Sequence, residues 1–126
     1  ASGLRVGCRN GNHENLRVFQ AADDLVTEVY RLTRVFPPEE RYGLQAQIRR
    51  ASVSVPTNVV EGCTRRSTRD YVHFLTMSLG SASEVRYLLG LARRLEYLPS
   101  EGGEHLERRY GELVRSLQKM INALEP

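Results

Sequence analysis

Apolar residues recur every three or four positions along most of the chain, as they do on one face of an α-helix. Pro37 and Pro38 follow the first such run, and because proline has no backbone N–H they must end that helix. The pattern therefore predicts a helix over residues 17–36. Its apolar face comprises Val18, Ala22, Leu25, Val29, Leu32 and Phe36.

Three further runs of this kind follow, and they predict helices over residues 40–61, 67–96 and 104–124. Pro56 lies inside the second run, but the apolar spacing continues across it, so we expect a kink rather than a break. The last two helices should be joined by a turn containing the pair Gly102–Gly103. No segment alternates between apolar and polar residues as a strand would.

Four helices joined by short turns run antiparallel to their neighbours, and apolar steps averaging 3.5 residues favour left-handed crossing. The sequence therefore predicts an all-α fold, an antiparallel up-down-up-down left-handed four-helix bundle. The bundle should occupy residues 15–126 as one domain. Residues 1–14 lack a sustained apolar period and should form a flexible N-terminal tail.

Positive charge is concentrated in one part of the chain. The net charge is +3, but the segment from residue 31 to residue 69 holds eight arginines against three acidic residues, a local charge of +5. Guanidinium groups suit bidentate contacts with phosphate. The commoner role of such arginines is a solvated or salt-bridged face. The candidate nucleic-acid-binding residues are Arg49, Arg50, Arg65, Arg66 and Arg69.

Two of the predicted helices carry a second apolar stripe. A helix of an isolated bundle needs only one stripe, and an exposed second one would be an apolar patch. We therefore expect a homo-oligomer. The small residues near Gly80 predict a close helix crossing or a subunit contact, in preference to a ligand groove. The candidate interface residues are Phe19, Val26, Tyr30, Phe74, Met77, Gly80 and Ser81.

Polar residues with catalytic or ligand-binding potential are sparse. Asn58 and Glu61 lie one helical turn apart, beside Pro56, and predict a structural polar cluster in preference to a ligand site. The best nucleophile pair, Cys63 with His73, is ten residues apart and lacks a third orienting group. No histidine has metal-ligand spacing with a cysteine. We therefore expect no catalytic residue, metal, cofactor or small-molecule substrate.

The remaining features concern the compartment. No apolar run approaches the roughly 20 residues needed to cross a bilayer, and charged residues interrupt the N-terminal segment where a signal peptide would be apolar. These features predict a cytoplasmic protein with no membrane partner. Two cysteines, Cys8 and Cys63, are too few for a disulfide framework, so free thiols are expected.

The segments 42–44, 47–51 and 53–62, which read YGL, QIRRA and VSVPTNVVEG, resemble a family of four-helix bundles encoded in 23S ribosomal RNA intervening sequences. These proteins are often labelled S23 ribosomal proteins. The likeness covers about residues 15–124. It implies a ring-like homo-oligomer, often a pentamer. Related bundles are accessory partners of a reverse transcriptase in diversity-generating retroelements.

The sequence therefore favours a non-catalytic, homo-oligomeric bundle that binds structured RNA, or an RNA–protein complex, through an arginine-rich surface. The alternative is a protein-interaction adaptor, for example an accessory partner of a polymerase or a reverse transcriptase. In that case the spare apolar stripes would contact the partner, and the arginines would face acidic protein surface.

Overall fold

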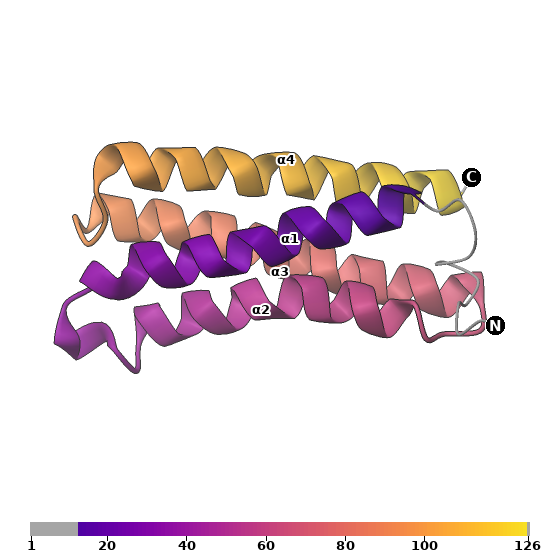
Figure 1. Cartoon of the computed structure of the whole chain (residues 1–126), viewed down its shortest axis with the longest axis horizontal. Helices are drawn as coiled ribbons and strands as arrows, with labels where there is room; N and C mark the ends of the chain where they lie inside the picture. Colours follow the sequence, from indigo (N-terminus) through magenta and orange to yellow (C-terminus); the bar gives the residue numbers. More distant parts are fainter. Residues whose placement is uncertain (1–12, 126) are drawn as a thin grey trace.

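The computed structural model describes residues 13–125. Within that range the chain is helical and contains no strand, so the all-α prediction is confirmed. Figure 1 shows the long helices lying side by side, with the chain reversing direction at each connection. The elements are α1 (His13–Leu32), two short 3-10 turns, η2 (Thr33–Val35) and η3 (Pro38–Glu40), and then α2 (Leu44–Gly62), α3 (Thr68–Arg94) and α4 (Ser100–Leu124).

Each helix contacts two neighbours and buries its predicted apolar stripe between them. α1 packs on α2 and α4, and α3 packs on the same two helices from the other side. The core is consequently one continuous column of apolar side chains along the bundle. The left-handed sense of the bundle stays a prediction. Side chains at the centre of the core include Leu25, Val29, Ile48, Val55, Leu75, Leu89 and Leu117.

The first helix begins and ends earlier than predicted. α1 starts at His13 rather than residue 17, so residues 13–14 do not belong to a tail. Asn15 is buried and its Nδ2 donates a hydrogen bond of 2.6 Å to the Tyr71 hydroxyl, which anchors this first turn to α3. The α-helix stops at Leu32, because the chain tightens there into η2. The rest of the predicted tail, residues 1–12, lies outside the described residues.

The second helix begins at Leu44 rather than residue 40, since the preceding residues form the separate turn η3. The Leu44 N–H donates to Oε1 of Glu40 at 2.9 Å, so a side chain from η3 caps the helix. At Gly43 a Cβ would lie 2.7 Å from the same oxygen, so a larger residue there would displace the Glu40 carboxylate. The α-helix then continues through Pro56 without a break, as predicted, and ends at Gly62, one residue late.

The last two helices also differ from their predicted bounds. α3 begins at Thr68 and ends at Arg94 rather than residue 96, because Glu96 has a positive φ of 63° that a helix cannot include. α4 begins at Ser100 rather than residue 104. The predicted turn at Gly102–Gly103 is instead the first turn of α4, in which the Gly103 N–H donates to the Pro99 carbonyl at 2.9 Å.

Tyr110 lies at the centre of the core with no exposed surface, and its hydroxyl has no hydrogen-bond partner among residues 13–125. Burial raises the pKa of this phenol, so it stays neutral. We expect Tyr110→Phe to raise the free energy of unfolding by about 1 kcal/mol, because an unpaired buried hydroxyl is destabilising. Urea unfolding of the variant and of the unchanged protein would measure this change in the free energy of unfolding.

Tyr71→Phe is the matched control. The Tyr71 ring is also buried, but its hydroxyl accepts the hydrogen bond from Asn15. Tyr71→Phe should lower the free energy of unfolding by about 1 kcal/mol, because it removes this bond. A loss of the same size in Tyr110→Phe would mean that the Tyr110 hydroxyl is bonded after all.

Candidate nucleic-acid-binding groove

The five arginines predicted to bind nucleic acid do not form one patch. Arg49 and Arg50 lie in the second turn of α2, whereas Arg65, Arg66 and Arg69 follow the other end of that helix. The 19 residues of α2 span about 28 Å at 1.5 Å per residue. Figure 1 accordingly places the α1–α2 and α2–α3 connections at opposite ends of the bundle. The predicted set therefore divides into two separate regions.

A groove of about 680 Å³ opens at the α1–α2 end, between the C-terminus of α1, the connection and the start of α2. No acidic residue lines it. We call this site the basic groove. Sequence reasoning included only its last two arginines, although the others lie within the segment of local charge +5. Its charged and aromatic lining consists of Arg34, Arg41, Arg49, Arg50, Tyr30, Phe36 and Tyr42.

Arg49 is held within the bundle. Its Nε donates to the Thr33 hydroxyl at 2.9 Å, and its Nη2 donates to the Tyr30 carbonyl at 3.1 Å. The guanidinium also lies 4.5 Å from the centre of the Tyr30 ring. Arg49 therefore joins the start of α2 to the last turn of α1, whose carbonyls lack helical partners. Neither Arg49 nor Arg50 forms a salt bridge with any described residue.

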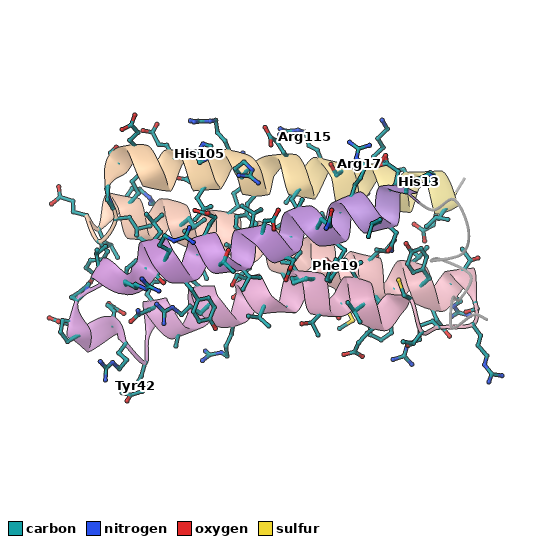
Figure 2. All side chains as sticks on the ribbon, viewed as in Figure 1. His13, Arg17, Phe19, Tyr42, His105 and Arg115 are labelled. Atoms are coloured by element: carbon teal, nitrogen blue, oxygen red, sulfur yellow. The ribbon has the colours of Figure 1, made fainter. Side chains whose placement is uncertain are left out.

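The other three arginines of the groove face solvent. Arg34, Arg41 and Arg50 are exposed, and within residues 13–125 none has a hydrogen-bond or ion-pair partner. Tyr42 is 87% exposed, and Figure 2 shows it projecting from the end of the bundle. Three guanidinium groups and one aromatic ring are thus available to an external ligand.

The connection that carries Arg41 and Tyr42 is held rigidly from both sides. Glu40 accepts the α2 N–H with one carboxylate oxygen and the Tyr97 hydroxyl, at 3.1 Å, with the other. This bond to the carboxylate raises the pKa of Tyr97. The Tyr97 ring also packs on Phe36, with 5.5 Å between ring centres. These contacts attach the connection to the segment that follows α3, and so support the backbone that carries Arg41 and Tyr42.

The predicted arginines at the α2–α3 end of the bundle are less available to an external ligand. Arg65 stacks over Phe74 at 4.4 Å and lies 3.5 Å from a Glu61 carboxylate oxygen, so its guanidinium is engaged within the bundle. Arg66 and Arg69 are exposed. Of the three predicted arginines at this end, only Arg66 and Arg69 are therefore without a hydrogen-bond or ion-pair partner among residues 13–125.

The predicted cluster of Asn58 and Glu61 is not assembled. Asn58 donates from Nδ2 to the carbonyl and the hydroxyl oxygen of Ser54, at 2.8 and 2.9 Å. The Ser81 hydroxyl donates to the same Ser54 oxygen at 2.9 Å, which links α2 to α3. Glu61 points elsewhere and pairs with Arg65. Asn58 therefore has the structural role expected of it, in a network that excludes Glu61.

Cys63 is disulfide-bonded, so the prediction of a free thiol there is wrong. A disulfide sulfur is no thiolate nucleophile, which leaves His73 without the partner considered for it. Cys8 lies outside the described residues. Residues 13–125 contain no group of three or more side chains that could hold a metal ion. In the same range no helix combines the length and the apolar character that crossing a membrane requires.

A shallow groove between α1 and α2 brings together four apolar residues, Phe19 and Val26 from α1 with Val53 and Val60 from α2. We call them the apolar face. Val53 and Val60 are 40% and 50% exposed, and Figure 2 shows Phe19 where α1 meets α2. The sequence analysis missed both valines. Their spacing of seven residues, two helical turns, was the available signal.

The other predicted interface residues are distributed differently. Tyr30 lies in the basic groove under Arg49. Phe74 lies beneath Arg65, and Met77 is 43% exposed on α3. A Cβ at Gly80 would meet no atom within 4 Å, so no helix of the same chain crosses closely there. The predicted close crossing does not involve Gly80 itself, but the neighbouring Ser78 is fully buried and its hydroxyl donates to the Val55 carbonyl at 2.8 Å, so the α2 backbone approaches α3 closely at this serine. The subunit contact stays a prediction.

The structure resembles a protein of unknown function from the S23 ribosomal protein family of Bacteroides thetaiotaomicron. The likeness has a TM-score of 0.79 and 24% sequence identity, and it covers 86% of this chain and 98% of the other. At that identity it shows the fold. No curated protein matches the chain. Residues 14–122 match a family described as 23S rRNA-intervening sequence protein. The match spans most of the chain, which therefore belongs to the 23S rRNA-intervening sequence protein family.

Proposed function

We propose that the protein is a non-catalytic bundle that binds structured RNA, alone or within an RNA–protein complex, through the basic groove. The observation that carries this proposal is the set of three exposed, unpartnered arginines around one groove that no acidic residue lines. Planar guanidinium groups bind phosphate in a bidentate manner, and the nearby Tyr42 adds a surface for a base.

We also propose that copies of the chain associate through the apolar face, as a homo-oligomer whose stoichiometry is the pentamer implied by the family resemblance. Val53 and Val60 expose a large fraction of their surface beside Phe19 and Val26, and association would remove that surface from water. A ring would present several basic grooves at once. Its avidity could exceed the affinity of one groove by roughly a hundredfold.

The apolar face also supports a second candidate function, an adaptor that docks a partner enzyme such as a polymerase or reverse transcriptase. Capture from native lysate, with and without nuclease treatment, separates the two functions. A partner protein that remains after nuclease treatment favours the adaptor. Its loss on treatment favours RNA binding.

Replacing the three free arginines of the groove tests the RNA-binding function. We expect the triple variant Arg34→Gln, Arg41→Gln, Arg50→Gln to bind a hairpin RNA at least tenfold more weakly at low salt. Each lost phosphate contact should also reduce the slope of log affinity against log salt by about 0.7, so the triple variant should lose about 2. Fluorescence anisotropy titrations across a salt series would measure both effects.

The control removes the same charge elsewhere. Arg66→Gln, Arg69→Gln, Arg115→Gln replaces three exposed arginines outside the groove. This control variant should bind the hairpin RNA more tightly than the triple groove variant does. Its slope of log affinity against log salt should also stay closer to that of the unchanged protein. Equal or greater weakening by the control would place RNA binding elsewhere, and absence of binding by the unchanged protein would contradict the proposed function itself.

A further inference from the structure

We infer that the basic groove binds an unpaired nucleotide, with the base stacked on Tyr42 and the flanking phosphates held by Arg34, Arg41 and Arg50. This inference rests on the proposed function and narrows it from RNA in general to single-stranded segments, such as hairpin loops and free ends.

The exposure of Tyr42 is the first argument. The side chain is 87% exposed, and its ring has no stacking or cation–π partner among residues 13–125. It stands on a connection that Glu40 and Tyr97 hold in place, so the ring is presented by a rigid support. A solvent-facing aromatic ring beside cationic groups is the usual platform on which single-stranded nucleic acids stack their bases.

The surrounding charge is the second argument. Arg34 belongs to η2, Arg41 precedes the tyrosine in the connection, and Arg50 lies on α2, so the three cations come from three segments around one groove. Arg49 is held toward the bundle by two of its donors, on Thr33 and Tyr30, so the ligand contacts are assigned to the three arginines without such bonds. A nucleotide chain crossing the groove could therefore place phosphates on guanidinium groups while its base covers the tyrosine ring.

The form of the ligand follows from base accessibility. In an A-form duplex each base is covered above and below by its neighbours, and the major groove is too deep and narrow for side chains to read. Away from the ends of a duplex, only an unpaired base offers a face to Tyr42. The groove volume, about 680 Å³, lies within the range of sites for small ligands, which matches a nucleotide rather than the side of a double helix.

The experiment compares single-stranded oligouridine with a blunt RNA duplex of the same length, by fluorescence anisotropy at low salt. Tyr42→Ala should weaken oligouridine binding at least fivefold, because stacking is lost. Tyr42→Phe keeps the ring and should stay within about twofold of the unchanged protein. Tyr87→Ala removes another exposed tyrosine, on α3, and should change nothing. Duplex affinity should be the same in all four proteins.

Two results would overturn the inference while leaving the proposed function intact. One is an oligouridine affinity that Tyr42→Ala leaves unchanged, although the triple arginine variant still weakens it. The other is that Tyr42→Ala weakens the binding of oligouridine and the binding of the duplex equally. If the unchanged protein bound none of the three RNAs, which are oligouridine, the duplex and the hairpin, the inference and the proposed function would fail together.

Discussion

Arg49→Ala should lower the free energy of unfolding by about 2–3 kcal/mol. Hydrogen bonds from a charged donor contribute about 1.5–3 kcal/mol, and the contact with the Tyr30 ring adds about 0.5–1 kcal/mol. The variant also leaves the Tyr30 carbonyl with the longer contact from the Thr33 hydroxyl, at 3.4 Å, in place of the bond from Arg49. Urea unfolding followed by circular dichroism would measure the loss.

Two further variants separate this role from simple charge. Arg50→Ala removes the adjacent exposed arginine and should change stability by no more than about 0.5 kcal/mol. Arg49→Lys keeps the charge but should recover little, because an ammonium lacks the planar fork that reaches both Thr33 and Tyr30. Equal stability of Arg49→Ala and Arg50→Ala would show that the contacts of Arg49 contribute nothing.

Val60→Glu should dissociate the proposed homo-oligomer, raising its dissociation constant about a hundredfold. The valine lies in the apolar face, and a carboxylate buried there without a partner would cost about 3 kcal/mol, which corresponds to that factor. Because Val60 is half exposed in the single chain, the fold itself should tolerate the change. Sedimentation velocity over a concentration series would measure the assembly.

Leu95→Glu places the same charge on a residue of similar exposure, 48%, at the C-terminal end of α3, and should leave the assembly intact. Identical dissociation by both variants would show that charge alone, and not the apolar face, controls association. An unchanged protein that stays a single subunit at high concentration would contradict the assembly.

The helices were predictable from the sequence, whereas their ends were not. A stripe such as Leu25, Val29 and Leu32 depends only on spacing, and one face of a helix must bury it. The start of α2 depends instead on the Glu40 carboxylate, which lies in the preceding turn η3 and accepts the Leu44 N–H. Likewise Gly103 lies in the first turn of α4 rather than in a connecting turn, and its N–H donates to the Pro99 carbonyl. The placement of such groups does not follow from the spacing of apolar residues, which is the signal that predicts the helices.

The candidate site was predicted only in part for the same reason. Arg49 and Arg50 are adjacent in the sequence, yet one is held within the bundle and the other faces solvent. Their separation from Arg65 follows from the length of α2, which carries the chain to the opposite end. Arg34 and Arg41 were visible as charges, but only the contact between α1 and α2 places both of them in one groove with Arg50.

Ultraviolet crosslinking tests most directly whether the basic groove is the surface that binds RNA. Oligouridine carrying a photoreactive uridine would be crosslinked to the unchanged protein, digested with trypsin and analysed by mass spectrometry. We expect the adduct on the tryptic peptide 42–49, at Tyr42, because trypsin cleaves after Arg41 and Arg49. Crosslinks confined to residues 63–69 at the opposite end of the bundle, or to the outer surface of α4, would contradict this account.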